Sequence, residues 1–301
     1  MSDDRPPLPA NHRCLAALGW TATILVSALP DIVCLETTHA LPAWLVPAKA
    51  GLLVVLVIAA QLSAPLRPLR NFGLLLVVFF GLGALRQRVD FTLPGLQSAL
   101  GGSPFDVRMQ AEQTGKLAAA LVMIGALLAL GYRRRDFFLV RGALRAPIEP
   151  VPLLGFPRPV AWPRFGLQWA LYIAVALAVL QYLALRPAGT VLLKVPAMLP
   201  SILFYAALNA FNEELLYRAP MLATLEPAGG SRHALWMSAY FFGIGHYFGT
   251  PGGLGGGIAS VFMGWILGKG MVETRGLFWT WWIHFLSDVA IFFFLAAALV
   301  T

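Results

Sequence analysis

Apolar residues are gathered in nine long runs, and short polar or proline-rich segments separate one run from the next. The nine runs are Leu15–Leu35, Ala43–Ala64, Asn71–Leu85, Glu112–Gly131, Phe165–Leu185, Val195–Leu222, His233–Phe248, Leu254–Met271 and Leu277–Val300. A helix needs about 20 residues to cross the hydrocarbon core of a bilayer. The pattern therefore predicts an all-α, polytopic membrane helix bundle with about eight or nine transmembrane helices. The short run at residues 71–85 could re-enter the membrane instead of crossing it.

Arginines are distributed unevenly among the segments between the runs. The densest cluster comprises Arg133, Arg134, Arg135, Arg141 and Arg145, with Arg158 and Arg164 further along. Because cytoplasmic loops carry an excess of Lys and Arg, we assign this cluster to the cytoplasm. Successive spans place their connecting segments on alternate sides of the membrane. Counting outward from the cluster, the N-terminus is also cytoplasmic, and so are Arg5, Arg13, Arg67, Arg70, Arg232, Lys269 and Arg275. The opposite side receives Lys49, Arg186, Lys194, the loop at residues 86–111 and the C-terminus.

The composition agrees with an integral, multi-pass membrane protein. Of the 301 residues, 58% are hydrophobic and 12% are charged, whereas soluble domains are about 45–50% apolar and about 25% charged. The net charge is +8, but the basic residues lie beside apolar runs. We therefore expect the lipid bilayer, and no nucleic acid, as a partner. Cys14 and Cys34 have neither the spacing of a metal site nor that of a disulfide framework.

A proline-rich stretch divides the chain in two. Five prolines lie from residue 147 to residue 159, and such a density is incompatible with a helix. We interpret residues 146–164 as an extended cytoplasmic linker. It follows an N-terminal transmembrane half of about four helices (residues 1–145), which has few ionisable groups within its runs, and it precedes a C-terminal transmembrane domain (residues 165–301).

Ionisable residues inside membrane-spanning helices are costly and mark function by default. The sixth run contains Asn212-Glu213-Glu214-Leu215-Leu216-Tyr217-Arg218. Glu214 and Arg218 are four residues apart, so they share a helix face and can pair. Glu213 points about 100° away, without that partner and free for chemistry. The alternative is a polar helix end at the membrane surface.

Two further runs carry histidines. The seventh contains Phe242 and His246, and the last contains His284 and Asp288 at i,i+4. Each motif alone is compatible with a structural role, as a hydrogen-bonded histidine or a buried pair that fixes helix packing. A helix rise of about 1.5 Å per residue nevertheless puts the polar groups of all three helices at similar depth. Surface positions would not share that depth.

A glutamate, two histidines and an aspartate allow two routes to hydrolysis within a membrane. Glu213, His246 and His284 can hold a zinc ion that activates water. Without metal, Glu213 helped by His246 can act as a general base on water. His284 and Asp288 would then stabilise an oxyanion or orient a carbonyl. The chain has neither a G-x-S-x-G nor an H-E-x-x-H motif, so serine and zincin-type mechanisms lack their residues.

Glycines in and directly before the eighth run have small-xxx-small spacing, namely Gly253 with Gly257 and Gly264 with Gly268. The run lacks the Lys-Ser/Thr ending of a phosphate loop. Close helix packing beside the polar cluster is therefore the interpretation we favour.

The three motifs together, E-E-x-x-x-R, F-x-x-x-H and H-x-x-x-D, resemble the signature of the CPBP family of intramembrane proteases. That family includes CAAX prenyl protease Rce1-like and bacterial Abi-type proteins, and the similarity covers about residues 165–300. The resemblance implies a glutamic-type intramembrane endopeptidase. Glu213 and His246 would activate the water, and His284 with Asp288 would form the oxyanion site. Glu214, Arg218 and Phe242 would support them.

The resemblance also implies a membrane-associated or lipid-anchored peptide or protein as the substrate. Asp288 stands where prenyl proteases have Asn, so it is expected to orient or charge His284 and not to donate directly. No cofactor is predicted, and zinc is the possible exception. The Ala-, Leu-, Gly- and Arg-rich composition favours a bacterial inner membrane. The alternatives are a zinc-dependent protease with the same residues, a non-catalytic immunity or scaffold protein, and a transporter, which the lack of inverted repeats disfavours.

Overall fold

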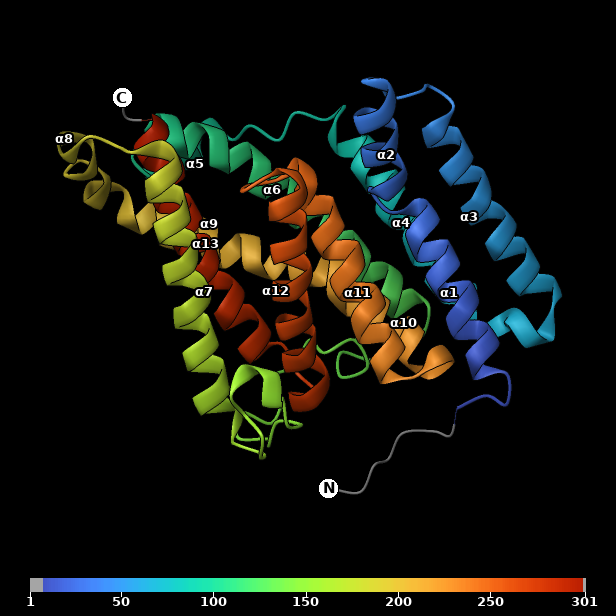
Figure 1. The fold of residues 1–301 in the computed structure, drawn as a ribbon. Coiled ribbons are helices and arrows are strands. Elements are labelled where there is room, and N and C mark those ends of the chain that lie inside the picture. The colour runs from blue at the N-terminus through green and yellow to red at the C-terminus, as the bar shows by residue number, and fades with distance from the viewer. Residues whose placement is uncertain (1–7, 300–301) are drawn as a thin grey trace.

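The computed structural model describes residues 8–299, and within that range the chain is a bundle of helices without strands (Figure 1). The longer helices are α1 (His12–Val26), α2 (Leu29–Thr38), α3 (Leu45–Leu62), α4 (Arg70–Arg86), α6 (Pro104–Ala129), α7 (Trp162–Leu185), α9 (Leu199–Glu213), α10 (Ala219–Gly229), α11 (Ser231–Gly245), α12 (Gly253–Thr274) and α13 (Phe278–Leu299). Short elements join them: η1 (Ala64–Leu69), α5 (Pro94–Ala99), η2 (Pro152–Leu154), α8 (Gly189–Leu192), η3 (Val195–Met198), η4 (Glu214–Arg218) and η5 (His246–Phe248).

Seven segments of the described chain are long and apolar enough to cross a membrane, and α1 with α2 makes an eighth if this bent pair is one span. The all-helical fold is thus confirmed, with a helix count at the lower end of the expected range. The short third run joins η1 to form a 23-residue segment of sufficient length. The expected span at residues 233–248 forms α11, whose 15 residues reach only about 22 Å. α11 is therefore not among the seven segments of sufficient length, although it leads from the lower end of the bundle to the start of α12 at the upper end (Figure 1).

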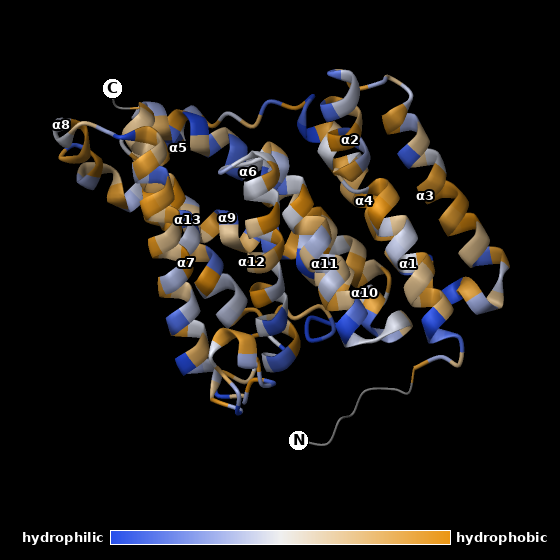
Figure 2. Cartoon of the chain, viewed as in Figure 1, coloured by the Kyte–Doolittle hydropathy of each residue, from blue (hydrophilic) through white to orange (hydrophobic). Residues whose placement is uncertain are grey.

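Apolar side chains cover the outer helices, as expected for a surface in contact with lipid. Figure 2 shows hydrophobic residues along α3 and α7 and hydrophilic residues in the loops below them. Large exposed side chains on these helices include Val46, Val55 and Ile58 on α3 and Leu171, Val175 and Leu183 on α7. The chain is an integral, multi-pass membrane protein on this composition and helix length.

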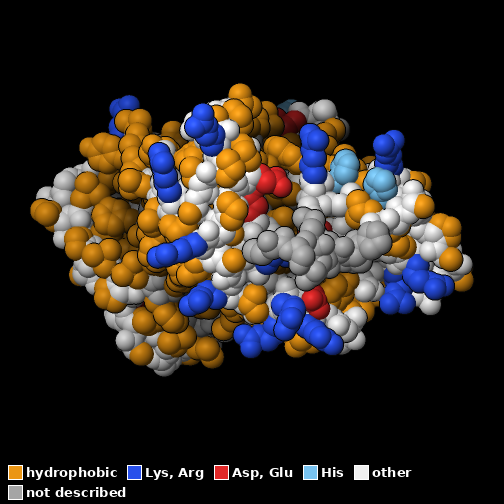
Figure 3. All heavy atoms as spheres, turned by 90° about the horizontal axis from the view of Figure 1, so that it is seen from below, with side chains coloured by type: hydrophobic (Ala, Val, Ile, Leu, Met, Phe, Trp, Pro, Cys, Tyr) orange, Lys and Arg blue, Asp and Glu red, His pale blue; other side chains and the backbone are white. Residues whose placement is uncertain are grey.

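The segments assigned to the cytoplasm lie together at one end of the bundle. The start of α1, η1, the loop before α7, the α10–α11 junction and the α12–α13 junction are all at the lower end in Figure 1. Seen from below, this end carries many Lys and Arg side chains (Figure 3). The alternation inferred from sequence therefore agrees with the fold, while the side of the membrane that this end faces stays a prediction. Arg5 and Val300, which belong to that prediction, lie outside the described residues.

The proline-rich stretch forms a packed hairpin at the lower end. It contains no α-helix: the Ile148 amide donates to the Val160 carbonyl (2.9 Å), and the Trp162 amide donates to that of Ala146 (2.9 Å). Glu273 on α12 accepts hydrogen bonds from the Glu149 amide (3.0 Å) and the Trp162 indole (2.9 Å). The segment is thus extended, as expected, but it is fixed against α12.

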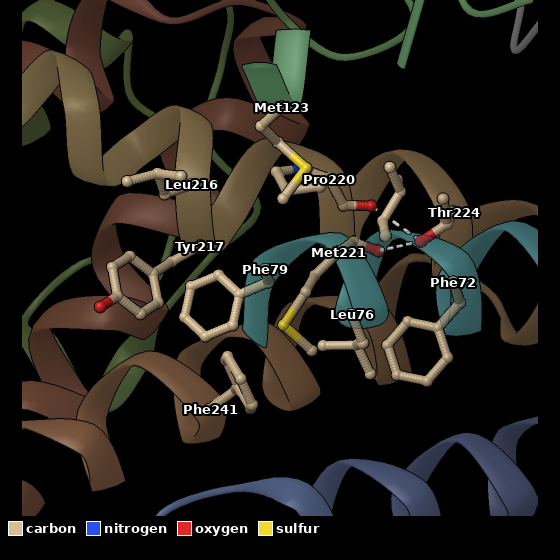
Figure 4. Close-up of a pocket in the computed structure, with 11 residues that line it drawn as sticks. Phe72, Leu76, Phe79, Met123, Leu216, Tyr217, Pro220, Met221, Thr224 and Phe241 are labelled. Carbon is tan, nitrogen blue, oxygen red and sulfur yellow. Dashed lines mark hydrogen bonds between the residues drawn. The ribbon is translucent and has the colours of Figure 1, made fainter. Parts of the chain in front are cut away.

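The polar motif of the sixth run interrupts its helix. α9 ends at Glu213, and residues 214–218 form a π-helical turn, η4, before α10 begins. Such turns inside α-helices often occur at functional sites. Leu216 and Tyr217 of η4 contact an apolar pocket shared with α4 and α11, with Phe79 and Phe241 among its lining residues (Figure 4). Its volume of about 10 Å³ admits at most one water, so it is a packing seam that supports η4 and not a ligand site.

Candidate active site

Glu213 is held by a lysine from the N-terminal half. Lys116 on α6 donates to Glu213 Oε1 (2.8 Å) and to Asn209 Oδ1 (2.7 Å), and it lies 3.1 Å from Glu112 Oε1. Glu213 is nearly buried, with 8% of its surface exposed. Glu213 lacks Arg218 as a partner, as expected, but it is not free, because the Lys116 ammonium is bound to it. The partner comes from a helix 97 residues earlier, where helix periodicity gives no indication of it.

Glu214 faces the other way and forms the pair that its spacing predicts. Its carboxylate accepts from Arg218 Nη1, and both side chains are fully buried. The Arg218 guanidinium lies over the ring of Phe242, 4.6 Å from the centroid, which is a cation–π geometry. Phe242 thus contacts the buried ion pair of η4 from α11.

His284 lies between three carboxylates. Its Nδ1 donates to Glu214 Oε1 (2.7 Å), and its Nε2 is 3.6 Å from both Glu213 Oε2 and Asp288 Oδ2. The imidazole is 2% exposed. Asp288 in turn accepts from the Asn209 amide (2.9 Å). These contacts link α9, η4 and α13 into one hydrogen-bonded cluster.

His246 approaches the cluster from the end of α11. Its Nδ1 lies 2.9 Å from the Phe242 carbonyl oxygen. A carbonyl only accepts hydrogen bonds, so Nδ1 carries the hydrogen and Nε2 is the ring atom left for other partners. The Phe242 ring contacts both histidines, at 4.3 Å from His246 and 5.8 Å from His284 between centroids. Phe242 therefore spaces the two imidazoles.

A cavity of about 320 Å³ adjoins the cluster. Glu213, His246, Asp288 and Lys116 line it, and so do Asn209 and the apolar ends of α7 and α13. Exposed Arg108, Gly249 and Thr250 border it. Its volume lies at the lower end of the range of ligand pockets, which is about 300–1,000 Å³. It brings a carboxylate and an imidazole from two motifs into one water-accessible space.

The donor set does not fit a resident zinc ion in this arrangement. Among residues 8–299, no group of three or more His, Cys, Asp or Glu side chains is placed to hold a metal ion. The Lys116 ammonium already lies on one oxygen of Glu213. A cation beside that carboxylate competes electrostatically with a divalent ion.

Three site residues were not identified from the sequence. Lys116 and Gln113 lie on α6, and Asn209 lies one turn before Glu213; Gln113 donates to Asn209 Oδ1 (2.8 Å). Asn212 donates to the Gln113 carbonyl (3.2 Å). One signal was present, because Lys116 follows Glu112 by four residues inside an apolar run, and such charges mark function by default.

Comparison with known families supports the assignment made from the motifs. Residues 195–290 match the family model described as type II CAAX prenyl endopeptidase Rce1-like. The matched range contains Glu213, His246, His284 and Asp288 and excludes Lys116. No curated protein and no solved structure matches the chain. The chain therefore carries an Rce1-like domain at residues 195–290, consistent with the CPBP/CAAX protease family.

Proposed function

We propose that this protein is a glutamic-type intramembrane endopeptidase that cleaves a membrane-associated peptide or protein. The Rce1-like family supports a CAAX-type intramembrane endopeptidase. The observation that carries the glutamic-type mechanism is the shared cavity. Glu213 and His246, which come from separate motifs and separate helices, both line it.

In the proposed mechanism, Glu213 is the general base. Its carboxylate takes a proton from a water in the cavity while the water oxygen attacks the scissile carbonyl. His246 presents Nε2 to the same space, because its Nδ1 is bound to the Phe242 carbonyl. Its Nε2 orients the water, then accepts the proton from Glu213 and passes it to the nitrogen of the leaving amine. Glu213 returns to its carboxylate form when the amine departs.

The negative charge that develops on the carbonyl oxygen needs donors. His284 in its imidazolium form offers Nε2–H, because Nδ1 already donates to Glu214. Asp288 lies 3.6 Å from that Nε2 and accepts from Asn209. Asp288 is thus placed to orient and charge His284. This is the role expected from the sequence, because an ionised Asp cannot itself donate to an oxyanion. Lys116 supplies a second positive charge on the other side of Glu213.

The substrate class follows from the location of the site. A cluster buried between membrane-spanning helices is reached by a substrate that is itself in or on the bilayer. We propose a membrane-associated or lipid-anchored substrate, and a bacterial inner membrane as the location on the composition of the chain. An immunity or scaffold role without catalysis is the alternative function.

Substitution at the two proposed catalytic positions tests this function. We expect Glu213→Gln and His246→Ala each to lower cleavage of a membrane-anchored reporter peptide by roughly 10²–10⁴-fold. His233→Ala is the matched control, because His233 lies at the opposite end of α11 from His246, is exposed, and accepts from the Trp20 indole (3.2 Å). Full cleavage by Glu213→Gln would refute the mechanism. Full biological activity of both variants would favour the scaffold role.

Metal content distinguishes the glutamic-type mechanism from the zinc-dependent alternative with Glu213, His246 and His284. We expect purified protein to contain zinc well below one equivalent and to keep its activity after chelation. Stoichiometric zinc, with activity lost on chelation and restored by zinc, would establish the metalloprotease instead.

A further inference from the structure

Gln181 is a polar side chain on the wall of the cavity that the proposed mechanism does not use. It lies near the end of α7, in an apolar stretch that runs from Tyr172 to Leu185. Only 7% of its surface is exposed. It lines the same cavity as Glu213, His246 and Asp288. The lining therefore combines catalytic groups with a buried side-chain amide.

The side-chain amide of Gln181 differs from the other buried side-chain amides of the described chain in making no hydrogen bond. Its Nε2 is buried without a partner. The other buried Asn and Gln residues all donate or accept: Gln110, Gln113, Asn209 and Asn212. Gln168 on the same helix donates to the Tyr172 hydroxyl (2.9 Å). Gln181 is thus a polar group whose pairing the fold itself does not provide.

A buried amide without a partner is costly, and membrane proteins place such groups where they bind something or face a polar path. The terminal torsion of glutamine is broad, so a turn of the amide brings its N–H groups to the cavity. The ligand must supply oxygen atoms that accept hydrogen bonds from these N–H groups. A peptide does so, since its main chain presents a carbonyl at every residue.

The rest of the wall indicates where the side chains of such a peptide lie. Leu185 on α7 and Phe292 and Leu295 on α13 line the cavity beside Gln181. These residues form an apolar surface, whereas Glu213, Asp288 and Lys116 form a charged one. An extended peptide can place apolar side chains on the first surface and its scissile amide at the second.

We propose that Gln181 is a substrate-binding residue whose side-chain amide donates to a main-chain carbonyl of an extended, apolar peptide. This inference rests on the proposed peptidase function and deepens it. It adds a binding contact on α7, outside the three motifs and outside residues 195–290. No bond is made or broken at Gln181, and its contribution is to hold the peptide in register with Glu213.

Binding is measured without turnover in full-length Glu213→Gln protein in lipid nanodiscs. The probe is a fluorescein-labelled, N-terminally palmitoylated decapeptide of Ala, Leu and Val, and anisotropy gives its Kd. Adding Gln181→Met, which keeps the side-chain length but cannot donate, should weaken binding roughly fivefold to tenfold, the amount expected for one hydrogen bond. Adding Gln168→Met is the matched control and should leave Kd unchanged. Thermal unfolding of each variant confirms that it is folded.

An ester scan of the probe identifies the carbonyl. Replacing one amide of the peptide by an ester weakens the preceding carbonyl as an acceptor. We expect one position to lose affinity with Gln181 present and to lose none with Gln181→Met. Equal Kd values for both proteins, or the same ester profile in both, would overturn the inference even where the wild type cleaves the peptide. Absence of any cleavage by the wild type would count against the proposed function, whatever Gln181 does.

Discussion

At the residue scale, the site is a row of alternating charges that crosses four helical segments, α6, α9, η4 and α13. Arg218 pairs with Glu214, Glu214 accepts from His284, and His284 lies beside Glu213, whose other oxygen binds Lys116. Each carboxylate in this row has a cation or a histidine on two sides. Buried charges persist when they are paired and hydrogen-bonded in this way. Glu213, the proposed general base, is thus held at one carboxylate oxygen by Lys116 and lies beside His284 at the other.

The contact between Lys116 and Glu213 predicts a specific coupling. Lys116→Met should lower stability by about 3–5 kcal/mol, because it leaves a buried carboxylate without its cation. Glu213→Gln in the same chain should restore much of that loss, since it removes the stranded charge, but it should not restore cleavage. Thermal unfolding of the two single variants and the double variant measures the coupling. Strictly additive changes in unfolding free energy would contradict it.

The residues that could be predicted from the sequence are those whose contacts lie within one helix. Glu214 with Arg218 follows from a spacing of four residues. Lys116 with Glu213 and Asn209 with Asp288 join positions 97 and 79 residues apart, and no local period encodes such pairs. The motifs thus predicted most of the polar cluster, while the contribution of α6 required the fold.

At the element scale, the seam between α11 and α12 depends on glycine. A Cβ on Gly243 would lie 2.2 Å from the Val261 amide nitrogen, and one on Gly264 would lie 3.1 Å from Ala239 Cα. The predicted close packing is confirmed for Gly264 and for Gly268, where a Cβ would lie 2.5 Å from Leu235 Cδ1. A Cβ on Gly257 would make only ordinary contacts, the nearest at 3.7 Å, and one on Gly253 would lie in open space. This seam sets the position of His246, three residues after Gly243.

Gly243→Ala should therefore affect both stability and catalysis. The added methyl group forces α11 away from α12, and we expect a loss of about 1–3 kcal/mol together with lower cleavage, because His246 moves with the end of α11. Gly255→Ala on α12, where nothing lies within 4 Å of the new Cβ, is the control and should be neutral. Unfolding midpoints and cleavage rates of the two variants make the comparison. An unfolding midpoint and a cleavage rate equal to those of the wild type would show that the contact between α11 and α12 can accommodate the extra methyl group.

The runs of apolar residues predicted the helices well, since hydrocarbon thickness imposes their length. Breaks within a run were not predictable, because they arise from tertiary contacts. The π-helical turn η4 is one example, as its Leu216 and Tyr217 pack against α4 and α11. The proline-rich segment is another: proline density excluded a helix, but its fixed position comes from the contacts of Glu273.

At the scale of the whole molecule, the basic end and the cavity lie at opposite ends. The residues that border the cavity belong to the start of α6, the end of α7, the segment before α12 and the end of α13, and these meet at the upper end in Figure 1. The basic loops lie at the lower end (Figure 3). If the basic end is cytoplasmic, water and substrate enter from the other side of the membrane.

Cysteine labelling in whole cells tests this orientation. In a background of Cys14→Ser and Cys34→Ser, we expect Lys194→Cys to react with a membrane-impermeant maleimide. Arg134→Cys should react only after the cells are permeabilised. Both positions are exposed in the structure, so burial does not explain a difference between them. The reverse pattern would place the cavity on the cytoplasmic side.

The position of Lys116 has a consequence for how relatives of this protein are recognised. A homologous chain with an apolar residue at this place in α6 would keep every letter of the three motifs, and a search based on residues 195–290 would score it as highly as this one. Its glutamate would nevertheless lack the cation that it has here. Relatives that differ in this way would be found by inspecting one lysine in the half of the chain that the family signature leaves out.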